Sequence, residues 1–180
     1  AQEADPGFAM AYWGEAMTHN HPIWHRQEYE EGQAALLKLG ESPEARLAKA
    51  ETELEKDLLK AAETLFGEGE KVARDKAYAD YLAKLHEKYP ENQEVAAFYA
   101  LSLLGAVPVG RDEDAYERGA AIAQGILKEN PRHPGALHYL IHSYDDPSHA
   151  RLALNAANSY AKVAPDAAHA LHMPSHIYVA

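Results

Sequence analysis

The chain has 180 residues, and 17 Lys and Arg stand against 28 Asp and Glu, so the formal net charge at pH 7 is −11 with His counted as neutral. This charge repels phosphate backbones and argues against nucleic-acid binding. No uncharged apolar run reaches the about 18 residues of a membrane-spanning helix, so membrane insertion is not expected. The absence of cysteine excludes disulfides and thiolate metal ligands.

The spacing of apolar residues predicts an all-α fold of short helices that end at Pro and Gly. A first helix is predicted to begin with Pro6 in its first turn and to run to about Thr18, and a loop is predicted over 19–24. Further helices are predicted at 26–38, 43–66, 70–88, 91–105, 113–129, 134–145, 147–162 and 166–180.

A shift of 34 residues superimposes one segment of the chain on another, and a period near 34 is typical of stacked two-helix repeats. The superimposed pairs are Pro131 and Pro165, Ala136 and Ala170, Leu137 and Leu171, His138 and His172, and His142 and His176. The segments that begin at Pro6 and Pro90 follow the same template. Repeated helix pairs are therefore predicted.

DPGFAMAYWGEAM, the helix rich in small residues over 150–160 and the prolines between helix pairs resemble the tetratricopeptide-repeat (TPR) superfamily. More narrowly, AMTHNHPIW, FYALSLLG, HPGALHYLIHSYDDPSHA and HALHMPSHIY resemble a bacterial TPR-like group. The resemblance implies one domain over 1–180, in which helix-turn-helix repeats stack in a short right-handed superhelix. It further implies a fragment or trimmed form of a longer array and an extracytoplasmic location, and it assigns no activity.

Histidines carry the strongest chemical signal, because ten of the eleven lie in two groups: His19, His21 and His25, and then His133, His138, His142, His149, His169, His172 and His176. His138 and His142 are four residues apart, so on a helix their side chains share one face and can bind one metal ion. His172 and His176 repeat this spacing. If the repeats stack, all four imidazoles meet on the concave face of the superhelix.

Other residues are weaker candidates for this metal site. His21, His149 and His169 are the next candidate ligands, and His133 is expected to cap the helix that contains His138, whereas the roles of His19 and His25 stay open. Asp145 and Asp146 are expected to orient imidazoles or to supply a carboxylate ligand. Pro174 either restarts the last helix, which breaks the spacing of His172 and His176, or kinks it so that both rings aim at one point.

The sequence therefore predicts a metalloprotein that binds one or two transition-metal ions. Imidazole and carboxylate ligands suit copper or zinc, with iron as a further candidate. A metal ion with an open coordination position would support a metal-dependent oxidoreductase or hydrolase, and both stay open.

Three alternatives remain. A TPR scaffold could bind a peptide, a partner protein or a small molecule in a groove lined with histidines. The histidines could instead form a metal-free layer, hydrogen-bonded to one another and to tyrosines such as Tyr139 and Tyr144. Finally, the chain could be a structural piece of a longer array.

Overall fold

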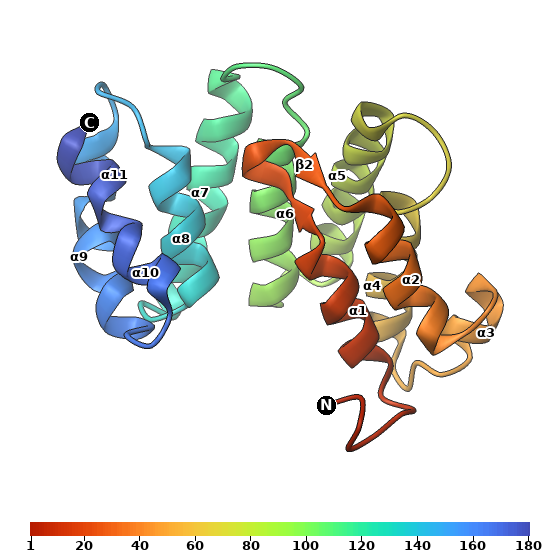
Figure 1. The fold of residues 1–180 in the computed structure, drawn as a ribbon. Helices are drawn as coiled ribbons and strands as arrows, with labels where there is room; N and C mark the ends of the chain where they lie inside the picture. The colour runs from red at the N-terminus through yellow and green to blue at the C-terminus, as the bar shows by residue number, and fades with distance from the viewer. The chain divides into compact units, whose positions relative to one another are not determined.

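The computed structural model describes all 180 residues, and apart from one very short hairpin its regular structure is helical (Figure 1). This confirms the predicted all-α class, while the TPR-like repeat and the superhelix remain predictions. One domain over 1–180 is predicted from the sequence, and the structure contains two compact units, Ala1–Leu85 and His86–Ala180. None of the helices combines the length and apolar character needed to cross a bilayer.

The first unit contains the hairpin and the first helices of the chain. Its elements are α1 (Ala9–Thr18), β1 (Asn20–His21), the 3-10 turn η1 (Pro22–Trp24), β2 (Arg26–Gln27), α2 (Tyr29–Leu39), α3 (Pro43–Leu47), α4 (Glu53–Leu65) and most of α5 (Lys71–Lys88). The strands are antiparallel, with Asn20 opposite Gln27 and His21 opposite Arg26. Because 26–27 pair in this hairpin, α2 begins three residues later than predicted.

The start predicted for the first helix is wrong, because α1 begins at Ala9 and Pro6 lies in the preceding turn. The Asp5 carboxylate accepts a hydrogen bond from the Gly7 N–H at 2.9 Å. The Pro6 carbonyl accepts another from the Tyr12 hydroxyl at 3.0 Å. The carboxylate of Asp5 thus holds a local turn that competes with the first turn of a helix.

The single helix predicted over 43–66 is also wrong, because the structure divides it into α3 and α4. Each of the two helices has its own N-cap. The Ser42 hydroxyl accepts a hydrogen bond from the Ala45 N–H, and Thr52 and Glu55 form a reciprocal capping box. The second cap, at Thr52, satisfies N–H groups that a continuous helix would have paired internally, so it marks the start of a separate helix.

The second unit contains the remaining helices. They are α6 (Gln93–Gly105), α7 (Glu113–Glu129), α8 (Pro134–Ser143), the 3-10 helix η2 (Ala150–Ala153), α9 (Leu154–Val163), α10 (Ala168–His172) and α11 (Pro174–Val179). α7 has the predicted bounds, and α5, α6 and α8 lie within two residues of theirs. The helix predicted over 147–162 begins later, because Asp146 accepts hydrogen bonds from the N–H groups of Ser148 and His149 in a turn.

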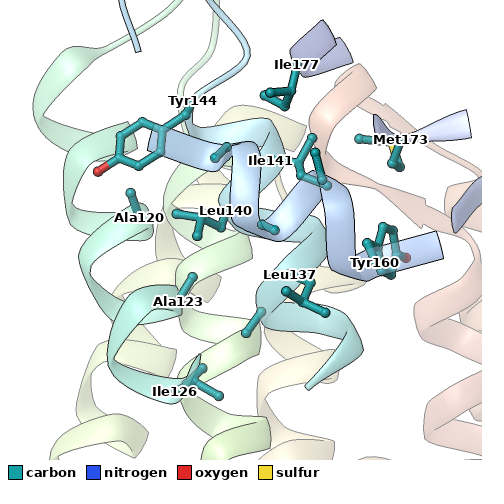
Figure 2. Close-up of a cluster of buried hydrophobic side chains, with 14 of the residues drawn as sticks. Ala120, Ala123, Ile126, Leu137, Leu140, Ile141, Tyr144, Tyr160, Met173 and Ile177 are labelled. Carbon is teal, nitrogen blue, oxygen red and sulfur yellow. The ribbon is translucent and has the colours of Figure 1, made fainter. Parts of the chain in front are cut away.

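The core of the second unit forms around α8, as Figure 2 shows. Leu137, Leu140 and Ile141 of this helix are buried, and Ile141 is completely covered. Ala120 and Ala123 of α7 are completely buried as well, and their small side chains allow the two helices to approach closely. Helices α9 and α11 also pack against α8. The position of α8, and of the histidines that it carries, is therefore set by packing on several sides.

Candidate metal centre

Helix α8 begins with a capping histidine. His133 is only 4% exposed, and its Nδ1 accepts a hydrogen bond from the Ala136 N–H at 3.1 Å. Pro134 follows at the first helical position, where the missing N–H is not needed. The structure thus confirms the predicted capping role of His133. Because the lone pair of its Nδ1 is used by the cap, this histidine serves helix α8 rather than a metal ion.

Three histidines of the second unit bring their ring nitrogens together. His138 Nε2 lies 3.1 Å from His142 Nε2 on the same helix and 2.9 Å from His169 Nε2 on α10. One ligand atom from each of the three residues lies within 4.8 Å of the other two, a group that could hold a metal ion. His142 is buried, His138 is half-buried and His169 is exposed, so the group extends from the interior to the solvent.

The hydrogen-bonding capacity of these nitrogens favours a cation between them. A neutral imidazole nitrogen carries either one hydrogen or one lone pair. His138 Nε2 faces two other Nε2 atoms, so a single hydrogen or lone pair must serve both contacts. Three lone pairs aimed at one metal ion remove this conflict. With metal–nitrogen bonds of 2.0–2.1 Å, the nitrogens of a tetrahedral site lie about 3.3 Å apart. The distances of 3.1 and 2.9 Å from His138 Nε2 to the other two Nε2 atoms are close to this value.

The protonation states also suit metal binding. Burial, reinforced by the neighbouring histidines, lowers the pKa of His138 to about 4 and that of His142 to about 3. Burial and the nearby His172 and His176 also lower the pKa of His169. Imidazole binds a metal ion only in its neutral form, so these rings present lone pairs at neutral pH without having to lose a proton.

The last two candidate ligands form a pair of their own. Helix α10 ends at His172 and α11 begins at Pro174, so the helix restarts at the proline, one of the two predicted outcomes. Met173 nevertheless keeps helical dihedral angles. As a result, His172 Nε2 still lies 3.0 Å from His176 Nε2, and the two rings meet despite the interruption.

The two groups are neighbours and together form a closed circle of imidazoles. Its members, in spatial order, are His169, His138, His142, His176 and His172. Successive ring centroids are 4.8, 4.8, 5.7 and 4.9 Å apart, and 6.2 Å separates His172 from His169. Tyr160 of α9 stacks on His138 with a centroid distance of 5.4 Å. We call these five residues the histidine circle.

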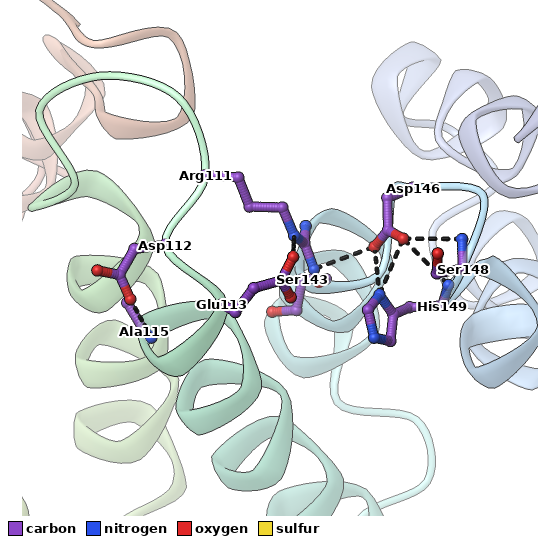
Figure 3. A network of polar contacts seen from close by, with 8 residues as sticks. All are labelled: Arg111, Asp112, Glu113, Ala115, Ser143, Asp146, Ser148 and His149. Atoms are coloured by element: carbon purple, nitrogen blue, oxygen red, sulfur yellow. Dashed lines mark hydrogen bonds and ion pairs between the residues drawn. The ribbon is translucent and has the colours of Figure 1, made fainter.

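The two adjacent aspartates after α8 each hold one imidazole. Asp145 Oδ2 lies 2.7 Å from His176 Nδ1, so Asp145 orients a member of the circle. Asp146 lies 2.8 Å from His149 Nδ1 and 3.1 Å from Arg111 Nη2 (Figure 3). His149 also stacks on Tyr144 and is not part of the three-histidine group.

The early histidines belong to the first unit and contact a carboxylate there. His21 Nε2 lies 3.1 Å from Glu28 Oε2, and His19 Nδ1 lies 3.5 Å from the same oxygen. Hydrogen bonding to His21 is the main cause that lowers the pKa of Glu28. His25 is exposed and adopts a left-handed backbone with φ of 52°. The structure thus gives His21 a carboxylate partner within its own unit.

The grouping of ligands differs from the one that the repeat suggested. Spacing indicated two pairs that converge, whereas the structure joins His169 to His138 and His142 and leaves His172 with His176. The contact between His138 and His169 spans 31 residues and depends on how α10 packs. The only sequence signal for the contact between His138 and His169 is the position of His169 one helical turn before His172.

The fold and the site together define an all-α protein with a histidine cluster that could hold a metal ion. Comparisons with models of known families, with curated proteins and with solved structures found no match. The TPR-like resemblance therefore stays a prediction, and the function has to be argued from the chemistry of the cluster.

Proposed function

We propose that the protein binds a transition-metal ion through His138, His142 and His169. The observation that carries this proposal is the approach of three Nε2 atoms, in which His138 Nε2 lies 3.1 and 2.9 Å from the other two. Burial that keeps His138 and His142 neutral supports it, because a protonated ring would repel the ion. The absence of cysteine leaves nitrogen ligands, which suit copper or zinc and also iron.

Three protein ligands leave at least one coordination position for water or a substrate. Sites of this kind are typical of catalytic zinc, whereas structural zinc sites have four protein ligands. The exposed side of the cluster, at His169, gives an external molecule access to that position. A metal-bound water could then act in hydrolysis, and copper or iron could act in oxidation. The metal that the protein retains decides between these two reaction classes.

The test is the metal content of the protein, purified without an affinity tag or nickel resin, with the double variant His138→Ala/His142→Ala as the comparison. We expect the wild-type protein to bind zinc or copper in a whole-number ratio by elemental mass spectrometry and calorimetry. The double variant should lose the ion of this site and keep its helical content by circular dichroism. A double variant that binds as much metal, and as tightly, as the wild type would overturn the proposal.

A matched control is His25→Asn, which also removes an imidazole. His25 is exposed and has a positive φ, which asparagine tolerates better than most residues. This variant should bind the same amount of metal as the wild type. If the wild-type protein takes up no metal, the alternative of a peptide-binding groove becomes the leading hypothesis.

A further inference from the structure

His172 and His176 have the geometry of metal ligands but lie outside the three-histidine group. Their Nε2 atoms are 3.0 Å apart, close to the distance between two nitrogens that share one ion. His172 is exposed and His176 is half-buried, so an ion can reach them from solvent. The proposed three-ligand site uses neither of them.

Asp145 fixes the orientation of this pair. Its Oδ2 lies 2.7 Å from His176 Nδ1, and a carboxylate can only accept a hydrogen bond, so His176 carries its hydrogen on Nδ1. The lone pair of a neutral His176 is then on Nε2, the atom that faces His172. A carboxylate behind an imidazole is the usual arrangement around metal-binding histidines, because it sets the tautomer and makes the ligand more basic.

The pair also lies beside the first group. The rings of His142 and His176 are 5.7 Å apart between centroids, and those of His169 and His172 are 6.2 Å apart. Two groups of ligands thus occupy opposite arcs of one histidine circle. Adjacent metal ions are typical of sites that hold a reacting oxygen between them.

We propose that His172 and His176 bind a second metal ion, with Asp145 as the positioning residue, so that the histidine circle is a two-ion centre. This deepens the proposed function and rests on it for the first ion. The second ion has two imidazole ligands and is completed by water or an external ligand. It therefore binds more weakly than the first ion and is the one more exposed to solvent.

The test is a titration of the 180-residue chain with zinc, followed by native mass spectrometry. Wild type should bind two ions, His172→Ala/His176→Ala should bind one, and His138→Ala/His142→Ala should bind one with the lower affinity. Wild-type protein that binds a single ion, which His138→Ala/His142→Ala loses, would overturn the second site and leave the proposed function intact. A single ion that His138→Ala/His142→Ala keeps and that only the pair variant loses would overturn both the two-ion centre and the proposed first site.

The role of Asp145 is tested separately with Asp145→Asn, which keeps an oxygen acceptor but removes the charge. We expect the affinity for the second ion to fall about 10- to 100-fold while the first ion binds as before. The charge-matched control is Asp166→Asn, at an exposed position before α10, and should change neither affinity. An unchanged second affinity in Asp145→Asn would remove Asp145 from the proposal, and an equal loss of both ions would indicate a general structural defect.

Discussion

At the scale of single residues, the candidate site depends on imidazoles that are kept neutral. His142 is 6% exposed and lies next to His138, so a proton on either ring would be poorly solvated and close to its neighbour. A metal ion bound there would differ from a proton, because it would gain several nitrogen ligands at once. Because burial disfavours the protonated form of these rings, the free energy of unfolding of the metal-free protein should fall in acid.

We expect the free energy of unfolding of the metal-free protein to fall as the pH decreases from about 6.5 towards 4. In this window the unfolded chain protonates His138 and His142, whereas the folded state, with pKa values of about 4 and about 3, does not. Well above pH 6.5 both states are neutral at these positions, and the loss vanishes. Each histidine contributes a slope of at most about 1.4 kcal/mol per pH unit.

Urea denaturation with chelator present, at several pH values from 7 to 5, measures this slope. The variant His138→Gln/His142→Gln lacks both groups and serves as the comparison. Its stability should depend less on pH in this window than that of the wild type. Equal slopes in the two proteins would show that these histidines are not held neutral.

The residue scale also shows why part of the site could be predicted. The pairs His138 and His142, and His172 and His176, follow from a four-residue spacing on a helix, and both pairs are in contact in the structure. The contact of His169 with His138 depends on the packing of α10 against neighbouring helices, which no local pattern specifies. Asp145 was expected to orient an imidazole, but only the fold shows that the imidazole is His176.

At the scale of secondary-structure elements, the packing of α7 constrains where small residues are needed. A Cβ atom at Gly119 would lie 2.6 Å from Leu104 Cδ1 and 3.2 Å from the Ala100 carbonyl oxygen of α6. Gly125 lies on the same helix, and a Cβ there would meet no atom within 4 Å. Helix α7 therefore has no room for a side chain at Gly119, whereas it has room for one at Gly125.

We expect Gly119→Ala to lower the free energy of unfolding by about 1–3 kcal/mol, because α6 or α7 must shift to make room. Gly125→Ala should raise it by about 0.5–1 kcal/mol, because alanine restricts the unfolded chain and favours a helix. Chemical denaturation of both variants measures the difference. Stabilisation by Gly119→Ala would show that the two helices are not as close as described.

Helices were predictable where the sequence contains an uninterrupted apolar pattern with clear ends. Asp112 caps the start of α7 and Asn130 follows its end, and the observed bounds of α7 are the predicted ones. The predictions failed where side chains of Asp or Thr compete for backbone N–H groups, as at Asp5, Thr52 and Asp146. These residues can be read in the sequence. Whether each one caps a helix or holds a turn depends on the path of the surrounding chain, which the local sequence does not specify.

At the scale of the whole molecule, the chain forms two compact units, and the histidine circle lies in the second of them. Its histidines come from α8, α10 and α11, which join the core of that unit through Ile141, Ala170 and Ile177. An ion bound by these helices cross-links segments that are distant in sequence. Metal binding should therefore stabilise the folded second unit.

We expect zinc to raise the free energy of unfolding in proportion to the logarithm of its concentration, by about 2.7 kcal/mol at 100 times the dissociation constant. The gain is smaller if the unfolded chain also binds zinc. Thermal denaturation at graded zinc concentrations measures it, and hydrogen exchange should show added protection in α8 and α10. The variant His138→Ala/His142→Ala should show little of either effect, and an equal stabilisation of this variant would argue against the site.

The gradient of exposure across the histidine circle has a consequence for how quickly metal is exchanged. His169 and His172 are exposed, whereas His142 is buried, so an arriving ion meets the outer rings first and reaches the inner ligand last. Release would follow the reverse order, so the bond between the ion and the buried ring of His142 would break first. Uptake at the proposed site would therefore be governed by encounter at the surface, and loss by the opening of the bond to the inner ligand. A competing chelator would then accelerate removal only until that opening becomes the slow step.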